Sequence, residues 1–142
     1  MTIASVLRKK GNDVISVSPE TLAVEVARLI TSRRIGAVLV RGPDGQVQGI
    51  VSERDIVRHL QTDGAALLQA PVAQIMTVEV HTCSPEDHIE ELAEAMTERR
   101  IRHVPVVADG RLHAIVSIGD VVKNRIDALQ AERDQLRDYI QQ

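Results

Sequence analysis

The sequence predicts a mixed α/β protein of the α+β kind, in which two tandem β-α-β-β-α repeats are followed by a long C-terminal helix. The first observation is a doubled segment: Ser18-Pro19-Glu20 and Arg33-Arg34-Ile35 recur 66 positions later (18 to 84) as Ser84-Pro85-Glu86 and Arg99-Arg100-Ile101. Second, "GIVSERD" (49–55) recurs as "AIVSIGD" (114–120), now 65 positions later (49 to 114), so one residue is missing from the second copy. Third, neither glycine nor proline occurs after Gly119, which favours one uninterrupted helix.

The first copy contains each element of such a repeat in order. The run 13–17 (DVISV) predicts a leading strand, and Ser18-Pro19 predicts a helix start, with serine as N-cap and proline at the first helical position. Apolar residues at helical spacing continue this helix: Leu22, Val26, Leu29 and Ile30. The runs 36–40 (GAVLV) and 46–52 (QVQGIVS) predict a hairpin around Gly42-Pro43-Asp44-Gly45, and 53–60 (ERDIVRHL) predicts the closing helix.

The second copy repeats this order. The run 78–82 (VEVHT) predicts the leading strand, and Ser84-Pro85 predicts a helix start. This helix continues through Ile89, Leu92, Ala93 and Met96. The runs 103–107 (HVPVV) and 111–117 (RLHAIVS) predict the second hairpin, and 118–126 begins the last helix. We therefore divide the chain into a first domain at 1–64, a second at 65–126 and a helical extension at 127–142.

The composition excludes several classes of protein. A net charge of −3 and an isoelectric point near 5.9 give no basic field for nucleic acid, and Tyr139 is the single aromatic residue on which a base could stack. No apolar run approaches the roughly 20 residues of a membrane span. Cys83 has no partner for an intramolecular disulfide. We therefore expect a soluble cytoplasmic protein that binds neither nucleic acid nor membrane.

Each copy places a serine and an aspartate where its second hairpin strand meets its closing helix: Ser52 with Asp55, and Ser117 with Asp120. A carboxylate at this place accepts hydrogen bonds and suits the paired hydroxyls of a ribose, while the free N–H groups of a helix N-terminus suit a phosphate. The same residues also serve as an ordinary N-cap and as a favourable acid of the first helical turn. The repetition of the pair favours a nucleotide site over capping alone.

The repeated Ser-Pro-Glu, Arg-Arg-Ile, Asp-Gly and Ile-Val-Ser-x-x-Asp segments together resemble a tandem pair of CBS domains, or Bateman module, from about Ile3 to Ile126. The segment 71–77 (PVAQIMT) is similar to the lead-in of the second domain in such pairs, and 2–11 (TIASVLRKKG) is a looser counterpart. The resemblance implies a stand-alone module of bacterial type with its repeats packed about a pseudo-two-fold axis. It also implies a homodimer, because such pairs commonly assemble as discs of two modules.

The resemblance also implies a function, namely the sensing of cellular energy state and signal transduction without catalysis. Asp55 and Asp120 would hold the ribose of an adenosine-containing nucleotide, such as AMP, ATP or NAD, in two clefts between the repeats. The regulated protein is not identified by the sequence. The alternative is a structural or protein-interaction module with vestigial clefts, which acts through its C-terminal helix.

The two copies differ in their cations, and each cleft of such a pair is lined by both repeats. Arg102 and His103 stand where the first copy has Gly36 and Ala37, and Arg54 stands where the second copy has Gly119. We expect Arg54, Arg102 and His103 to meet a phosphate, although ordinary solvated charge is an alternative, above all for Arg54. We expect Gly36 and Ala37 to leave room for a base.

Two further expectations concern the shape of the clefts. Val14 and Val80 are candidates for their apolar walls. Ala114 replaces Gly49, and its methyl group is expected to narrow one cleft, so that the two clefts are not equally occupied.

A catalytic or metal site is a weaker interpretation of the sequence. His81, Cys83 and His88 lie close together in the chain and resemble part of a metal site or a Cys–His nucleophile. However, no second cysteine, no paired ligand motif at zinc spacing and no glycine-rich phosphate loop accompanies them. We therefore expect no metal, no catalytic cofactor and no catalytic residue.

The closing helix of the second copy continues far beyond the length of the repeat. Its apolar residues form a heptad seam in which Arg133 takes one position: Val122, Ile126, Leu129, Leu136 and Ile140. The helix either packs back on its own module or pairs with another chain. The seam favours pairing in a homodimer.

Overall fold

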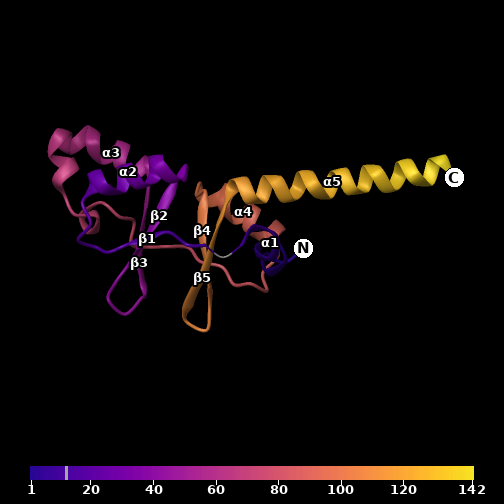
Figure 1. Ribbon diagram of the computed structural model, residues 1–142, viewed down its shortest axis with the longest axis horizontal. Coiled ribbons are helices and arrows are strands. Elements are labelled where there is room, and N and C mark those ends of the chain that lie inside the picture. The colour runs from indigo at the N-terminus through magenta and orange to yellow at the C-terminus, as the bar shows by residue number, and fades with distance from the viewer. Residues whose placement is uncertain (12) are drawn as a thin grey trace.

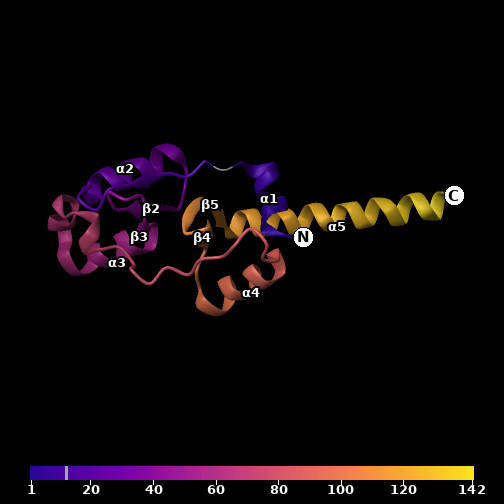
Figure 2. The ribbon, with the colours of Figure 1, turned by 90° about the horizontal axis from the view of Figure 1, so that it is seen from below.

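The computed structural model describes residues 1–11 and 13–142 and consists of two halves side by side, from which one helix projects (Figures 1 and 2). In chain order the elements are α1 (Ile3–Lys10), β1 (Ser16–Val17), α2 (Ala23–Arg33), β2 (Ala37–Arg41), β3 (Val47–Ser52), α3 (Glu53–Asp63), α4 (Ile89–Arg99), β4 (His103–Ala108), β5 (Arg111–Ser117) and α5 (Ile118–Gln141). Two short 3-10 helices, Gly64–Gln69 and Val72–Gln74, lie between α3 and α4. The predicted α+β fold with two similar repeats and a long last helix is confirmed.

Each half is built on an antiparallel hairpin. In the first half the strand order is β1-β2-β3, with β1 parallel to β2 and β3 antiparallel to it. In the second half β4 pairs with β5. Both hairpins have the same register at their open ends, where Ala37 pairs with Ser52 and His103 pairs with Ser117. The two Ser-x-x-Asp junctions therefore occupy equivalent places in the two halves.

Each half has its own aliphatic core. The first contains Ala23, Val26, Ile30, Val38, Val40, Val51, Leu67, Val72 and Ile75. The second contains Ile3, Val6, Leu7, Cys83, Ile89, Leu92, Met96, Val104, Val106, Ala114, Val116 and Val121. Helix α1 thus precedes the first repeat in sequence but packs into the second core. The lead-in of the second repeat packs into the first core in the same way, so each lead-in joins the opposite half.

The helices begin later than the sequence predicted. Ser18 and Ser84 do not cap them: α2 starts at Ala23 and α4 at Ile89. Each serine instead opens a turn, in which its carbonyl accepts a hydrogen bond from the N–H of Thr21 (3.1 Å) or Asp87 (3.1 Å). The prediction failed because a serine followed by proline also suits a tight turn, and the serine carbonyl here accepts the hydrogen bond that closes this turn.

The leading strands are also shorter than predicted. Strand β1 contains two residues, and 78–82 forms no strand; in this part of the chain only Cys83 pairs, through a parallel bridge to Val106. The physical reason is the preceding residue, Thr77, which exchanges two backbone hydrogen bonds with Ile50 of the first half at 2.9 and 3.0 Å. The segment therefore crosses from one half to the other and lacks a neighbouring strand along its length.

Helix α5 has 24 residues and extends away from both halves (Figures 1 and 2). At about 1.5 Å per residue it is roughly 36 Å long. Its first turns pack on the second half through Val121, whereas the rest of the helix lies in solvent. Within the described residues, no helix combines the length and the apolar composition that crossing a bilayer requires.

Candidate functional site

The two predicted aspartates are held in the same way. The N–H of Ser52 donates to Oδ2 of Asp55 at 2.9 Å and its hydroxyl donates to the same oxygen at 3.0 Å; the corresponding distances from Ser117 to Asp120 are 2.8 and 3.0 Å. In return, each serine Oγ accepts from the N–H of its aspartate at 3.2 Å. Both pairs are therefore capping boxes, as the alternative interpretation of the sequence predicted. In each pair, capping uses one carboxylate oxygen, Oδ2.

The remaining contacts of the two carboxylates differ. Oδ1 of Asp55 accepts hydrogen bonds from Arg58, one turn along α3, and from the Thr77 hydroxyl at 3.3 Å. Oδ2 of Asp120 instead forms an ion pair with Nζ of Lys10, at the end of α1. Asp55 is 5% exposed, and the Arg58 side chain above it is 59% exposed. A solvent-facing guanidinium therefore covers the buried carboxylate and can turn away without disturbing the core.

A cleft of about 560 Å³ lies beside Asp55 and is lined by residues of both halves. The first half supplies four of the predicted residues: Gly36, Ser52, Arg54 and Asp55. The second half supplies two, Arg102 and His103. The structure thus brings together six of the nine predicted site residues, from three stretches of the sequence. Arg58 and Thr77 also line this cleft, although sequence reasoning missed them.

Three predicted residues lie elsewhere. Ser117 and Asp120 form the equivalent junction of the second half and do not line this cleft. Ala37 is buried beneath the hairpin, where it pairs with Ser52. Of the two proposed apolar walls, Val80 lines the cleft, whereas Val14 packs against the second core.

Two expectations about cleft shape are changed by the structure. The room that Gly36 leaves is taken by His103, because a Cβ on Gly36 would lie 2.9 Å from the imidazole Cε1. The expectation that the Ala114 methyl narrows a cleft is wrong. Ala114 is 1% exposed and belongs to the second core, so its methyl group is packed against other apolar side chains.

Arginines gather at one end of the cleft. Arg54, Arg100 and Arg102 also line a smaller adjoining cavity of about 380 Å³ that has no acidic residue on its lining. Among the residues that the structure describes, none of these three arginines forms an ion pair. Sequence reasoning missed Arg100, although the repeated Arg-Arg-Ile segment pointed to it. Its backbone is left-handed (φ 54°) at the end of α4.

His103 lies where the two halves meet, and it is held neutral. Burial lowers the pKa of His103 below its ordinary 6.5, and the charges of Lys10 and Arg102 lower it further. Glu53 and Asp120 act in the opposite direction but do not outweigh these effects. In the free protein, the imidazole is thus a neutral hydrogen-bonding group at pH 7 and not the cation that the sequence suggested.

The residues of the weaker catalytic interpretation do not assemble. Cys83 is buried, and burial together with the nearby charge of Asp87 raises the pKa of its thiol to about 12. A thiol with that pKa carries almost no thiolate at pH 7 and is a poor nucleophile. His81 lines the cleft instead. Within residues 1–11 and 13–142, no group of three or more potential ligands is arranged to hold a metal ion.

The arrangement suits a particular kind of ligand. Asp55 offers a carboxylate that accepts hydrogen bonds, and Arg54, Arg100 and Arg102 form no ion pair among the described residues. Apolar side chains such as Ile50 and Val80 line the wall, and Glu53 and Glu79 also line the cleft. Such a cleft complements a molecule with a hydroxyl donor, a negative charge and a flat apolar part.

The chain is similar to known proteins along most of its length. The CBS domain family matches residues 3–62 and 72–127. The CBS domain-containing protein YhcV of Bacillus subtilis is 29% identical and covers 87% of this chain and 87% of its own. The mitochondrial CBS domain-containing protein CBSX3 of Arabidopsis thaliana is 32% identical and covers 99% of this chain and 72% of its own. The predicted cytoplasmic location stays a prediction.

Solved structures of similar chains have the same fold. A CBS-domain containing protein from Agrobacterium tumefaciens is 44% identical, with a TM-score of 0.86 over 88% of this chain and 99% of its own. A CBS domain protein from Pyrobaculum aerophilum, complexed with AMP, is 26% identical, with a TM-score of 0.74 over 84% of this chain and 89% of its own.

Proposed function

The chain belongs to the CBS domain family as a tandem pair of domains, and we therefore propose that it is a regulatory module that binds an adenosine-containing nucleotide, such as AMP, ATP or NAD, without transforming it. One observation carries the proposal: the acceptor Asp55 of the first half and the cations Arg54 and Arg102 of both halves line a single cleft. The AMP complex of the Pyrobaculum aerophilum protein supports this choice of ligand.

The ribose is assigned to Asp55. Its Oδ2 is used by Ser52, so the ligand hydroxyls approach Oδ1, which Arg58 covers in the free protein. A ribose hydroxyl replaces the guanidinium as donor, and the displaced Arg58 stays beside the ligand because it lines the same cleft. Charge-assisted hydrogen bonds of this kind are about twice as strong as neutral ones.

The phosphate is assigned to the arginine end of the cleft. Arg54, Arg100 and Arg102 lie together there without acidic partners among the described residues. An anion between them relieves their mutual repulsion and forms bidentate hydrogen bonds that a lysine does not provide. The base lies against the apolar wall formed by Ile50 and Val80.

Signalling follows from the position of this cleft. Because the ligand contacts both halves, it binds more tightly to the arrangement in which Asp55 and Arg102 are close than to more open ones. A nucleotide therefore shifts the population toward the closed arrangement. An unidentified regulated protein reads that change, which makes the module a sensor of cellular energy state.

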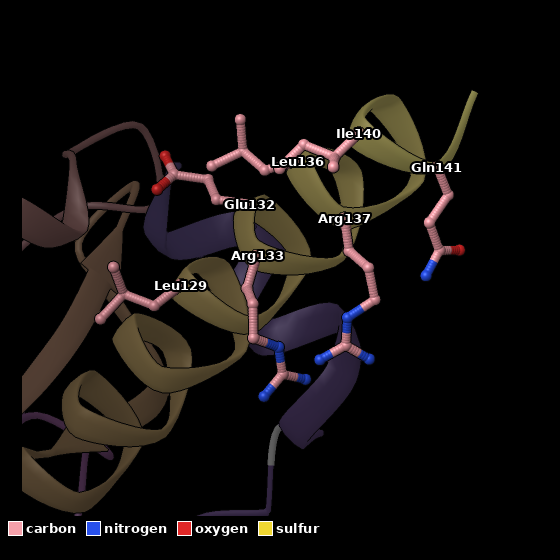
Figure 3. A pocket seen from close by; sticks show the side chains of 7 residues that line it. All are labelled: Leu129, Glu132, Arg133, Leu136, Arg137, Ile140 and Gln141. Atoms are coloured by element: carbon pink, nitrogen blue, oxygen red, sulfur yellow. The ribbon is translucent and has the colours of Figure 1, made fainter.

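A second candidate function is interaction through α5, and the exposed side chains of this helix favour it. Leu129, Leu136 and Ile140 line a shallow groove on α5 together with Glu132, Arg133, Arg137 and Gln141 (Figure 3). This groove is far from Asp55 along the chain, and its one carboxylate, Glu132, is exposed and not held in a capping box as Asp55 is. We assign it to a second copy of the chain, so that the sensor acts as a homodimer.

A thermal-shift panel tests the proposed function directly. AMP, ADP, ATP, NAD, S-adenosylmethionine and adenosine are added separately to the protein, and its melting temperature is measured. A ligand present at 100 times its Kd stabilises the folded state by about 2.7 kcal/mol. For a chain of this size, this raises the melting temperature by several degrees. If no member of the panel raises it, the interaction module becomes the preferred function.

The phosphate assignment predicts how this panel changes in a variant. Replacing Arg102 by glycine and His103 by alanine copies the first repeat and removes two groups from the cleft. We expect the shift produced by AMP to be largely lost, whereas the smaller shift produced by adenosine is kept. Equal losses for AMP and adenosine would contradict a phosphate contact.

The lowered pKa of His103 leads us to expect that nucleotide binding depends on pH. A phosphate beside the imidazole favours its protonated form, so binding raises the lowered pKa of His103 and takes up a proton. The affinity for AMP should therefore rise as the pH falls from 7.5 to 6, by at most about tenfold for each unit by which the pKa rises. Calorimetry measures the affinity at each pH for the unaltered protein and for a His103→Gln variant. The AMP phosphate titrates in both experiments, so any difference between the two pH profiles comes from His103. Identical pH profiles would remove His103 from the phosphate site.

A further inference from the structure

The second junction differs from the first in what covers its carboxylate. Ser117 and Asp120 reproduce the capping distances of Ser52 and Asp55 to within 0.1 Å. Asp120, however, is paired with Lys10, which lies 110 residues away in sequence. The same ammonium donates to the backbone carbonyl of Ile115 at 2.5 Å. Lys10 is therefore held by two acceptors of the second half.

The first half shows what Lys10 replaces. There the carbonyl of Ile50, the counterpart of Ile115, accepts a hydrogen bond from the N–H of Thr77 at 2.9 Å. The hydroxyl of Thr77 donates to Asp55 at 3.3 Å. In the second half the ammonium of Lys10 makes both kinds of contact by itself. The two lead-in segments thus reach the opposite half at equivalent places. The lead-in of the first repeat places the cation Lys10 on Asp120, whereas the lead-in of the second repeat places the neutral Thr77 on Asp55.

Lys10 also differs from Arg58, the cation that covers Asp55. Arg58 has one acceptor, belongs to the same helix as Asp55 and is 59% exposed. The Lys10 side chain is 30% exposed, has two acceptors and lies at the end of a helix whose Ile3, Val6 and Leu7 are in the second core. Lys10 shares Oδ2 of Asp120 with the Ser117 cap, so it does not contact Oδ1, but its ammonium bridges this carboxylate and the Ile115 carbonyl. A ligand that lies between these two groups must therefore displace an anchored ammonium, whereas a ligand at Asp55 displaces a mobile side chain.

The charge of Asp120 agrees with this pairing. Burial alone raises the pKa of Asp120, but hydrogen bonds from Lys10 and Ser117 and the positive charge of Lys10 outweigh it, and the pKa lies below its ordinary 3.8. The carboxylate is therefore charged at neutral pH, and the ion pair persists there. As the pH falls through the lowered pKa, Asp120 becomes protonated and the pair is lost.

We propose that Lys10 takes the place of a ligand beside Asp120, so that the chain binds nucleotide at Asp55 alone until Lys10 withdraws. The inference rests on the proposed function and states that, of the two carboxylates, Asp55 is accessible to a nucleotide and Asp120 is not. By the sequence repeat, the space beside Asp120 has fewer cations of its own, since Gly36, Ala37 and Gly119 stand where the Asp55 cleft has Arg102, His103 and Arg54. Once open, it should therefore accept the nucleoside part of the ligand and discriminate little between adenosine and AMP.

Amide NMR spectra resolve the two clefts in one titration. Adenosine and AMP are titrated separately into the unaltered protein and into a Lys10→Met variant, which keeps the aliphatic stem but not the charge. In the unaltered protein, ligand-induced shifts are expected at Ser52 to Asp55 but not at Ser117 to Asp120. In Lys10→Met, shifts are expected at both junctions, with similar affinities of adenosine and AMP at the second. Lys10→Gln replaces this variant if Lys10→Met fails to fold.

Two controls isolate the role of Lys10. Lys9→Met changes the neighbouring exposed lysine on the same helix and should behave like the unaltered protein. Adding Asp120→Asn to Lys10→Met should abolish the response of the second junction and spare the first.

If the second junction responds equally in the unaltered protein, or stays silent in Lys10→Met, Lys10 does not take the place of a ligand. If only the second junction of Lys10→Met responds, the inference holds and the proposed site at Asp55 fails. If no junction of any variant responds, both are overturned.

Discussion

Replacing Asp55 by asparagine is expected to weaken AMP binding by at least about tenfold and to leave the fold intact. Asp55 is 5% exposed, and Ser52 uses its Oδ2, so Oδ1 is the acceptor left for a ribose. Removing the charge weakens a charge-assisted hydrogen bond of about 1.5 to 3 kcal/mol, equivalent to roughly 10- to 150-fold in affinity. Calorimetry with AMP measures the change. Asp55→Ala, which also removes the capping partner of Ser52, should lose at least as much.

Asp120→Asn is the matched control for this substitution. Both variants change a carboxylate in a capping box of the same geometry, so their effects on helix capping should be similar. Because Lys10 occupies Asp120, the affinity for AMP should be unchanged in this control. No loss of affinity in Asp55→Asn would remove the ribose assignment. An equal loss in both variants would show that general destabilisation, and not a ligand contact, is the cause.

Much of the fold could be predicted from the sequence because two independent copies supported each element. The hairpin around Asp44-Gly45 and the one around Asp109-Gly110 are where the pattern put them. The starts of α2 and α4 were wrong in both copies for one reason, since Ser18 and Ser84 use their polar groups in turns. Repetition therefore confirms that an element exists but does not correct a shared error about its boundary.

The site could be predicted only where its residues belong to the repeated pattern. Asp55 was found because it recurs, and Arg102 because the same place in the other copy has a glycine. Arg58, Thr77 and Lys10 could not be found in this way. Their contacts depend on how α3 turns and where each lead-in crosses to the opposite half, which no spacing within a repeat expresses.

Gly49 illustrates the same limit. The sequence showed that Gly49 is replaced by Ala114 in the second copy, but not why. In the structure a Cβ on Gly49 would lie 2.8 Å from the backbone oxygen of Thr77 and 2.7 Å from the sulfur of Met76. The glycine is needed because the second lead-in passes directly over β3. Ala114 is free of this constraint because the corresponding place has room for its methyl group in the second core.

The seam on α5 raises the question of what covers it. Its five apolar side chains are all exposed: Val122 49%, Ile126 48%, Leu129 47%, Leu136 63% and Ile140 80%. An exposed apolar stripe of this length on a protein surface usually marks an interface, even though Arg133 takes one of its positions. Helix α5 does not pack back on its own module beyond its first turns, which removes one of the two alternatives that the sequence left open.

The charges beside the seam favour a second copy in parallel orientation. In a parallel pair, Glu132 of one helix lies opposite Arg137 of the other, whereas an antiparallel pair centred there sets Glu132 against Glu132. Arg133 interrupts the seam, and its guanidinium donates two hydrogen bonds of 3.2 Å to Asp134. That contact partly neutralises Arg133 but does not restore an apolar seam. We therefore expect α5 to add to contacts between the modules and not to form an independent coiled coil.

A single charge placed in the seam should weaken the dimer without removing any element. Leu136→Asp buries a carboxylate against the other helix, while Gln135→Asp introduces the same charge on another face of α5 and is the matched control. Sedimentation velocity at low micromolar concentration should show dissociation for Leu136→Asp alone. Dissociation of both variants would point to net charge as the cause.

Truncation after Asp127 is the larger test of the same interface. It removes Leu129, Leu136 and Ile140 but leaves the Asp55 cleft and both cores intact. Burying such side chains contributes about 1.5 to 3 kcal/mol each, so the loss of three should weaken the dimer by at least about a hundredfold while AMP binding is unchanged. A truncated chain that remains fully dimeric at low micromolar concentration in sedimentation would place the interface on the CBS modules alone. Loss of AMP binding together with the dimer would mean instead that the cleft depends on the second copy, because no residue beyond 127 lines it.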